Sequence, residues 1–235
     1  MQATSAPSHS SSAPKPVLFC WSGGKDSALA LHALSHRADV RVTGLLTTGT
    51  DEYDRISMHG VRRGLLLQQA QFLGLPLHEV RIPLQCVNPI YESRMEQALR
   101  VHLAEGVRTV AFGDIFLEDL REYRERNLGK LDMRAIFPIW KHDTRELARE
   151  FCQQGFRAIA VCIDSKKMDR SFAGRELTAD FFSDLPAGVD PCGENGEFHT
   201  FVFAGPIFSR AIGVQRGEVV DRGGFTFCDL KEQTP

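Results

Sequence analysis

The sequence predicts an α/β protein in which a five-stranded parallel sheet carries helices on both faces and is followed by a smaller C-terminal α+β portion. Two observations support this fold class. As far as residue 165, apolar runs of strand length alternate with segments of helical periodicity, which is the pattern of βαβ units with ligands at the carboxyl ends of the strands. Beyond Lys166 the pattern changes to short extended segments separated by Gly-rich turns.

The N-terminal part of the chain supplies the first three strands. Residues 1–15 are rich in Ser, Ala and Pro, so we expect a disordered tail outside the fold. Residues 17–21 are five consecutive apolar residues, as in a parallel strand that is covered on both faces. The next elements are a helix with Ala28, Leu31 and Leu34 on one face, a strand over 42–48, a helix over 61–73 that stops at Gly74, and a strand over 78–82.

The middle of the chain completes the predicted sheet. Its elements are a helix with apolar residues from Tyr91 to Leu103 on one face, a strand over 109–112, a helix from Asp143 to Gly155, and a fifth strand over 158–163. The second helix has a capping box, because Asp143 is a good N-cap and Glu146 follows three residues later. We therefore expect one domain over 16–165 and a C-terminal domain over 166–235 with a helix near 178–182.

Composition limits the classes of function. The formal net charge of −2 gives no overall positive field for a nucleic-acid backbone, which argues against nucleic acid and favours a small-molecule or protein substrate. The six cysteines include no CxxC pair, as expected in a reducing compartment. No apolar run approaches the roughly 18 residues that span a bilayer, and the first fifteen residues do not resemble a signal peptide. We expect a cytoplasmic protein with no membrane partner.

The junction between the first strand and its helix carries an anion-binding pattern. It reads Ser22-Gly23-Gly24-Lys25-Asp26-Ser27. Two glycines at a helix start allow free backbone N–H groups to approach an anion closely, and the helix dipole favours negative charge there. The motif is neither a Walker A loop nor GxGxxG. An ordinary Gly-Gly turn with Asp26 as a helix cap is the alternative.

A second polar segment lies far along the chain, over 188–200. It places Glu194, Glu197 and His199 directly before an extended segment. Two carboxylates and an imidazole suit general acid–base catalysis or metal binding, whereas a solvated polar turn is the alternative. Cys192 with His199 is a weaker candidate for a nucleophile pair, because no lowered thiol pKa follows from the sequence. The charge run Asp119, Arg121, Arg124 and Glu125 is typical of a solvated helix face.

The hexapeptide resembles the SGGxDS loop of the PP-loop ATP pyrophosphatase superfamily, which has the HUP fold. From about residue 16 to 208 the chain is similar to the diphthine ammonia ligase family. The motifs of this resemblance are the loop, Ser57-Met58-His59, Gly113-Asp114-Ile115, Pro138-Ile139-Trp140, Gly174-Arg175, Cys192-Gly193-Glu194 and Gly196-Glu197. Asn195 and His199 depart from the eukaryotic ligases, which have Gly and Glu there, so the acceptor substrate stays open.

The resemblance implies a ligase that uses ATP with Mg²⁺. A substrate carboxylate attacks the α-phosphate, pyrophosphate leaves, and ammonia then displaces AMP to give an amide; in the family the carboxylate is that of diphthine on elongation factor 2. The nucleotide site would comprise Ser22, Gly23, Gly24, Lys25, Asp26, Ser27, Thr47, His59 and Gly113. Asp26 is the candidate metal ligand. The candidate catalytic residues are Lys25, which would neutralise the pyrophosphate, and Glu194, Glu197 and His199, which would bind the acceptor or deprotonate ammonium.

Three other functions fit parts of the sequence. A PP-loop RNA-modifying enzyme would usually need a reactive cysteine pair or a strongly basic surface. A nucleotide-binding regulator without catalysis would have no use for the cluster from Glu194 to His199. A bacterial relative that adenylates a different carboxylate fits every residue equally well. A homodimer is compatible with the sequence, which leaves the oligomeric state and the ammonia source open.

Overall fold

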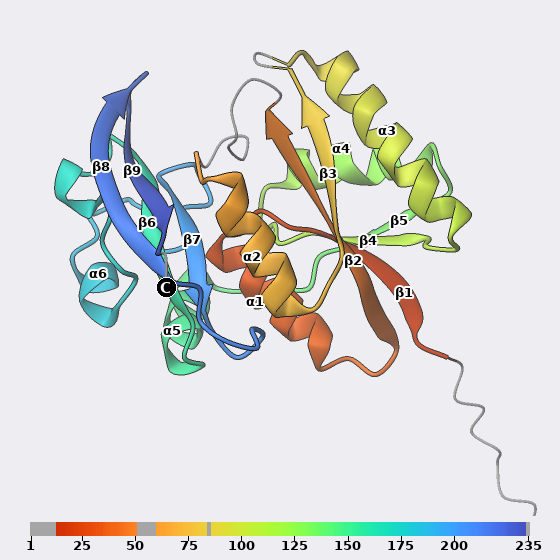
Figure 1. Cartoon of the computed structure of the whole chain (residues 1–235), viewed down its shortest axis with the longest axis horizontal. Helices are drawn as coiled ribbons and strands as arrows, with labels where there is room; N and C mark the ends of the chain where they lie inside the picture. The colour runs from red at the N-terminus through yellow and green to blue at the C-terminus, as the bar shows by residue number, and fades with distance from the viewer. Residues whose placement is uncertain (1–12, 51–59, 84–85, 234–235) are drawn as a thin grey trace, which may run out of the picture.

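The structure, a computed structural model, describes residues 13–50, 60–83 and 86–233. Most of the expected N-terminal tail and His59 lie outside the described residues. The described chain forms two sheets, a parallel one with strand order β3-β2-β1-β4-β5 and an antiparallel one with order β7-β6-β9-β8 (Figure 1). The predicted fold class, a five-stranded parallel sheet with a smaller C-terminal portion, is thereby confirmed.

The parallel sheet is built around a strand that is buried on both faces. Its strands are β1 (Lys15–Cys20), β2 (Val40–Thr50), β3 (Leu77–Ile82), β4 (Thr109–Ala111) and β5 (Arg134–Ile136). Val17, Leu18 and Phe19 of β1 are each fully buried. Since successive side chains of a strand point to opposite faces, Leu18 belongs to one apolar cluster and its two neighbours to another.

Helices cover both faces of this sheet. One face is covered by α1 (Lys25–Ser35) and α2 (Arg63–Leu73), and the other by α3 (Asn88–Ala104) and α4 (Glu118–Gly129) (Figure 1). The predicted stop of α2 is confirmed, because Gly74 has the left-handed conformation with φ 68° that ends many helices.

The assignment of residues 158–163 to the parallel sheet is wrong. They form β6 (Arg157–Asp164), which pairs in antiparallel fashion with β7 (Phe198–Ala204) and β9 (Phe225–Glu232). The fifth parallel strand is the three-residue β5, which is too short and too exposed to produce an apolar run. A continuous apolar run indicates a central strand but does not say of which sheet. Residues 157–164 thus belong to the C-terminal sheet, on the N-terminal side of the expected boundary at 165/166.

The C-terminal portion combines this sheet with short helices. Its other elements are α5 (Thr144–Gln153), a 3₁₀ turn (Arg170–Phe172), α6 (Ala179–Ser183) and the edge strand β8 (Val214–Arg222). The predicted cap of α5 is confirmed, since the Asp143 side chain accepts hydrogen bonds from the backbone N–H groups of Arg145 and Glu146. No described helix is long and apolar enough to cross a membrane.

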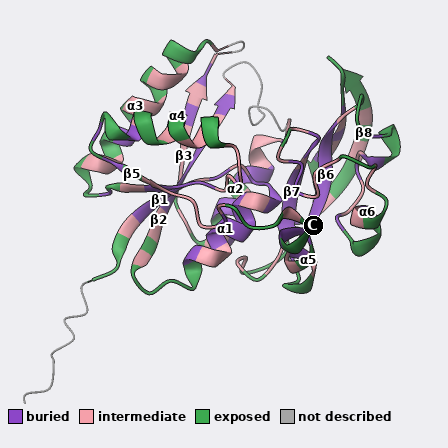
Figure 2. Ribbon diagram, turned by 180° about the vertical axis from the view of Figure 1, so that it is seen from behind, coloured by how far each residue is buried: buried purple, intermediate pink, exposed green. Residues whose placement is uncertain are grey.

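The two sheets share a helical layer. In Figure 1, α1 and α2 lie between the parallel sheet and the antiparallel sheet, and Figure 2 shows both helices largely buried. One apolar cluster therefore contains Phe19 of β1, Leu65 of α2 and Phe201 of β7. This arrangement brings the N-terminus of α1 between the carboxyl end of β1 and the start of β7.

Candidate functional site

A cavity of about 530 Å³ lies at the carboxyl ends of the parallel strands. Its walls come from the loop between β1 and α1, the ends of β2 and β4, the facing sides of α3 and α4, and the segment 192–200. Ligands of open α/β sheets bind at this position. The second polar segment of the sequence thus folds over the sheet edge that carries the glycine-rich loop, although the two segments are far apart in the chain.

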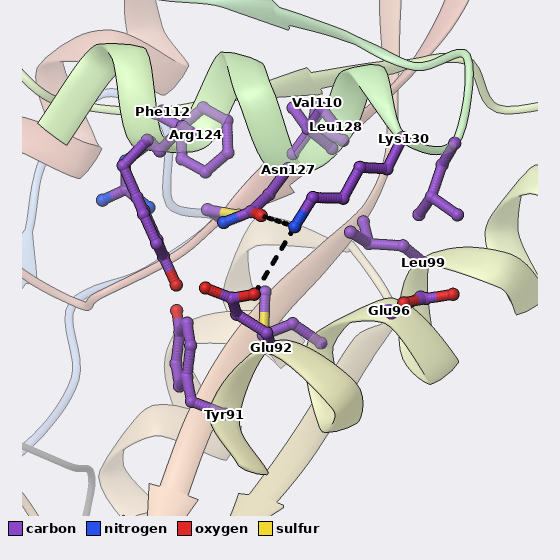
Figure 3. Close-up of a pocket in the computed structure, with 14 residues that line it drawn as sticks. Tyr91, Glu92, Glu96, Leu99, Val110, Phe112, Arg124, Asn127, Leu128 and Lys130 are labelled. Carbon is purple, nitrogen blue, oxygen red and sulfur yellow. Dashed lines mark hydrogen bonds and ion pairs between the residues drawn. The ribbon is translucent and has the colours of Figure 1, made fainter. Parts of the chain in front are cut away.

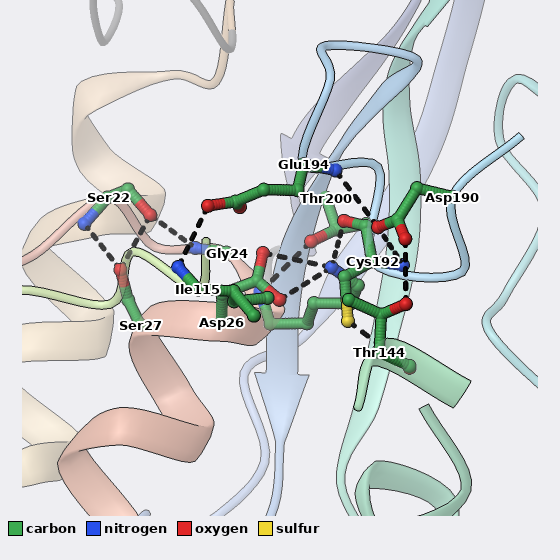
Figure 4. Close-up of polar contacts among 11 residues, drawn as sticks. Ser22, Gly24, Asp26, Ser27, Ile115, Thr144, Asp190, Cys192, Glu194 and Thr200 are labelled. Atoms are coloured by element: carbon green, nitrogen blue, oxygen red, sulfur yellow. Dashed lines mark hydrogen bonds and ion pairs between the residues drawn. The ribbon is translucent and has the colours of Figure 1, made fainter. Parts of the chain in front are cut away.

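Internal hydroxyl contacts shape the glycine-rich loop (Figure 4). The Ser22 and Ser27 hydroxyl oxygens lie 2.8 Å apart, and the Gly24 N–H donates to Ser22 Oγ at 3.3 Å. Gly24 is the N-cap of α1 and makes no side-chain cap hydrogen bond, so Asp26 does not cap this helix. Instead the Lys25 N–H donates to Thr200 Oγ1 of β7 at 3.0 Å. The hydroxyl oxygens of Ser22 and Thr200 therefore accept from two N–H groups at the start of α1, which is where phosphate oxygens commonly bind.

Lys25 is the charged centre of the site. Its side chain is 1% exposed, and Nζ donates to both carboxylate oxygens of Asp26, at 2.7 and 2.9 Å, and to the Cys192 carbonyl. Burial lowers the pKa of Lys25, but the attraction of Asp26 and of its other neighbours outweighs burial and raises the pKa overall. The ammonium group therefore stays charged at neutral pH in the wall of the cavity, as a phosphate ligand requires.

Glycine is required at two positions around the loop. A Cβ atom on Gly113, at the end of β4, would lie 3.0 Å from the Asp26 carbonyl carbon and from the Ser27 nitrogen. Gly23 has φ +81°, and a Cβ there would lie 2.8 Å from the side-chain oxygen of Gln69. Thr47, the other candidate of the nucleotide site, is buried at the end of β2 and lines the cavity. The structure thus brings together every candidate nucleotide-site residue that it describes.

Glu194 lies in the cavity wall with a shifted pKa. Its Oε1 accepts a hydrogen bond of 2.8 Å from the Ile115 N–H, just after β4 (Figure 4). Burial is the main cause that raises the pKa of Glu194 to about 7, partly opposed by that hydrogen bond and by Lys25. A carboxyl group with this pKa exchanges a proton readily at neutral pH, which suits a general acid or base.

Asp190 holds the segment that carries Glu194 and is a functional residue that was not predicted from the sequence. One of its oxygens accepts from the N–H groups of Cys192, at 2.9 Å, and Glu194, at 3.2 Å. The other accepts from the Thr144 hydroxyl at 2.7 Å (Figure 4). The Asp-Pro pair in a Gly-rich turn was the available signal, since Asp side chains often bond to nearby backbone.

His199 and Glu197 occupy different positions. His199 lines the cavity, and burial, together with the nearby charge of Lys25, lowers its pKa, so its imidazole is neutral at pH 7. Glu197 is 1% exposed and lies outside the cavity lining, where its Oε1 accepts from Asn195 Nδ2 at 3.2 Å and from the Asp190 N–H at 3.4 Å. Its Oε2 has no hydrogen-bond partner among the described residues. Glu197 therefore organises the segment from inside, unlike Glu194.

The cysteines of the cavity are not activated. Burial is the main cause that raises the pKa of Cys20, to about 12, and also that of Cys192. The Cys192 thiol contacts the Thr144 carbonyl oxygen at 3.5 Å. Because the thiolate is the nucleophile, the suggested pair of Cys192 with His199 lacks the reactive form.

The charge run on α4 is only partly solvated, which corrects the expectation from sequence. Asp119 and Glu125 are exposed, but Arg124 turns inward and donates to both oxygens of Asp114, at 2.5 and 3.1 Å. Arg121 lies over the ring of Trp140, with its guanidinium carbon 4.8 Å from the ring centroid. The charge run alone predicts a solvated face, because the partners of Arg124 and Arg121 lie outside the helix, in the loops after β4 and after β5.

A smaller apolar cavity of about 70 Å³ lies between α3 and α4 and adjoins the main cavity (Figure 3). Tyr91, Phe112 and Arg124 line both cavities. At its rim, Nζ of Lys130, directly after α4, donates to a carboxylate oxygen of Glu92 of α3 at 3.5 Å. The two cavities therefore share a wall that is mostly aromatic and aliphatic.

The donor set fits a magnesium ion held mainly by a nucleotide. Mg²⁺ usually binds one or two protein carboxylates together with substrate phosphates. Asp26 lines the cavity beside the loop, with its side chain 26% exposed. The described residues include no group of three or more His, Cys, Asp or Glu that could hold a metal by themselves. Asp26 would thus serve as one ligand beside the phosphates.

The family models and the curated relatives agree on one family. The diphthamide synthase N-terminal domain matches residues 15–135, and the diphthamide synthase C-terminal domain matches residues 143–234. A diphthine–ammonia ligase of Bos taurus is 27% identical over 89% of this chain and 86% of its own length. That of Schizosaccharomyces pombe is 27% identical over 92% of this chain, which spans only 38% of that relative. The solved U34-tRNA thiolase NcsA from Methanococcus maripaludis is 19% identical, with a TM-score of 0.34, over 57% of this chain and 55% of its own.

Proposed function

This chain belongs to the diphthamide synthase family, and we propose that it is an ATP-dependent carbon–nitrogen ligase that joins ammonia to an activated carboxylate. One observation supports this function above the others. The glycine-rich loop with its buried cation and the segment of Glu194 and His199 meet in a single cavity, which provides a phosphate site and proton-transfer groups side by side.

In the proposed first step an oxygen of the acceptor carboxylate attacks the α-phosphorus of ATP. The bond from that phosphorus to the bridging oxygen breaks, and pyrophosphate leaves with the electron pair. The backbone N–H groups of Gly24 and Lys25 donate to hydroxyl oxygens, and in this step they would exchange those acceptors for oxygens of the β- and γ-phosphates. Lys25 would stabilise the charge that grows on pyrophosphate. Mg²⁺, with Asp26 as a ligand, would supply further positive charge to the phosphates.

In the proposed second step ammonia attacks the acyl carbon and AMP leaves. Ammonium must first lose a proton, because the protonated form has no lone pair. Glu194, with a pKa of about 7, and the neutral imidazole of His199 both line the cavity and are the groups able to accept that proton. Glu197 has a supporting role in this scheme, since it lies outside the cavity lining.

We propose diphthine as the acceptor because the relatives are named diphthine–ammonia ligases. We further propose that the diphthine is carried by elongation factor 2 and that the reaction takes place in the cytoplasm. A different carboxylate is the second candidate, favoured by Asn195 and His199, which differ from the eukaryotic motif. A sulfur-transfer reaction on RNA is disfavoured, because it would need a reactive thiolate. Burial raises the pKa of both cavity cysteines, Cys20 and Cys192, and so keeps them as thiols.

Product analysis tests the proposal. Purified protein is incubated with α-labelled ATP, Mg²⁺ and ammonium, with and without elongation factor 2 that carries diphthine. We expect acceptor-dependent release of AMP and pyrophosphate and a new amide on the factor. AMP release that depends on another carboxylate would identify the second candidate. Acceptor-dependent ADP formation would contradict adenylation.

A further inference from the structure

Gln69 is a completely buried amide behind the glycine-rich loop. It lies on the face of α2 that also buries Leu65 and Leu66, and its exposed fraction is 0%. A glutamine on an apolar helix face is costly unless each polar atom finds a partner. In this position all of its hydrogen-bonding groups are satisfied, so the orientation of the amide is fixed.

The partners of Gln69 come from three separate elements. Its Oε1 accepts from Trp21 Nε1 at the end of β1 at 2.9 Å. Its Nε2 donates to the Gly23 carbonyl at 3.0 Å and to the Val202 carbonyl of β7 at 2.6 Å. The two hydrogen bonds that the Gln69 amide nitrogen donates thus join the glycine-rich loop to β7 of the antiparallel sheet.

The same loop carbonyl has a second donor from β7. The Val202 N–H donates to the Gly23 carbonyl at 2.9 Å, so that carbonyl accepts from both Gln69 and Val202. With both lone pairs engaged, the peptide that follows Gly23 has a fixed direction. This peptide contains the Gly24 N–H, at the start of the helix that faces the cavity.

We propose that Gln69 is a positioning residue that sets the shape of the phosphate loop by joining the Gly23 carbonyl to β7, so that the C-terminal sheet is part of the phosphate site. This inference rests on the proposed function, in which the loop binds the pyrophosphate part of ATP. The amide nitrogen of Gln69 is the atom that positions the loop, because it donates to the Gly23 carbonyl. Its effect should be confined to ligands that carry the β- and γ-phosphates.

The direct test measures binding of inorganic pyrophosphate and of AMP to the full chain by calorimetry. Gln69→Glu keeps an acceptor for Trp21 but loses the amide donors, and Gln69→Met loses both. We expect either change to weaken pyrophosphate binding about tenfold, or about 1.4 kcal/mol, while AMP binding stays within about twofold. Gln71→Glu, at an exposed position of the same helix, is the matched control and should change neither.

If Gln69 has a purely structural role, the variants should bind pyrophosphate and AMP equally weakly, or bind both normally. Either result would overturn the inference. Hydrogen exchange on the unaltered protein decides the question if the variants do not fold. Pyrophosphate, and not AMP, should slow exchange of the Val202 N–H, because its acceptor is the loop carbonyl. Unchanged exchange would reject the coupling. Failure of the unaltered protein to bind pyrophosphate would overturn the proposed function as well.

Discussion

At the residue scale, the protonation states of the site are set by burial and by neighbouring charges, which act in opposite directions on Lys25. Lys25 stays protonated beside Asp26, whereas Glu194 titrates near neutrality because burial opposes its ionised form. His199 is held neutral, with its lowered pKa. One cavity therefore contains a permanently charged lysine for binding phosphates and two residues, Glu194 and His199, that can accept a proton. The two kinds of group can act in successive steps.

Replacing Lys25 tests the phosphate half of the site. Lys25→Met keeps the aliphatic length and removes the charge, so we expect kcat/KM for ATP to fall about 100-fold or more, as for other electrostatic stabilisers. Lys166→Ala, at an exposed lysine, is the control and should leave turnover unchanged. Circular dichroism checks that the variant is folded. Normal ATP turnover by a folded Lys25→Met protein would reject the role of the loop.

The pKa of Glu194 predicts a pH dependence. A base that takes a proton from bound ammonium must be ionised, so at a saturating concentration of ammonium the rate of amide formation should rise with pH and level off above about pH 7. Glu194→Gln should be slower and lose this rise, while Glu122→Gln at an exposed position should keep it. Stopped assays from pH 5.5 to 8.5 measure both. An unchanged profile in Glu194→Gln would assign the base to another group, with His199 the next candidate.

At the scale of elements, the sequence predicted the loop well and its supports poorly. The six residues from Ser22 to Ser27 are contiguous, so their pattern could be recognised directly. Gln69 bonds to Gly23 and Asp190 bonds to Thr144, and in each pair the two residues are 46 positions apart in the sequence. A local sequence pattern does not reveal pairs at this separation. The strand β6 was found but placed in the wrong sheet, because burial on both faces is common to central strands of either sheet.

Asp190 should matter for the second polar segment and not for nucleotide binding. Asp190→Ala leaves three donors without their acceptor, so we expect a loss of about 1–3 kcal/mol in unfolding free energy. Amide formation should fall sharply while the Kd for ATP stays within about threefold. Denaturant unfolding and calorimetry measure these effects, with Asp180→Ala as an exposed control. An equal loss of ATP binding would show that the segment also serves the nucleotide.

At the scale of the whole molecule, the two sheets are not independent. The helices α1 and α2 are covered by the parallel sheet on one side and by the antiparallel sheet on the other (Figure 1). Separating the sheets would expose apolar residues such as Leu29 and Phe201, which belong to one buried cluster. The two family domains are therefore expected to behave as a single cooperative unit.

This packing predicts one unfolding transition for the chain. Trp21 is 2% exposed at the end of β1, so its fluorescence reports on the parallel sheet, while hydrogen exchange of β6 reports on the other. Both probes should give the same midpoint of thermal unfolding, since unfolding of either sheet exposes the apolar residues of α1. ATP with Mg²⁺ at about 100 times its Kd should raise that midpoint by about 5–10 °C for both probes. Two separated midpoints, or a shift in the parallel sheet alone, would show that the C-terminal sheet is not coupled to the phosphate site.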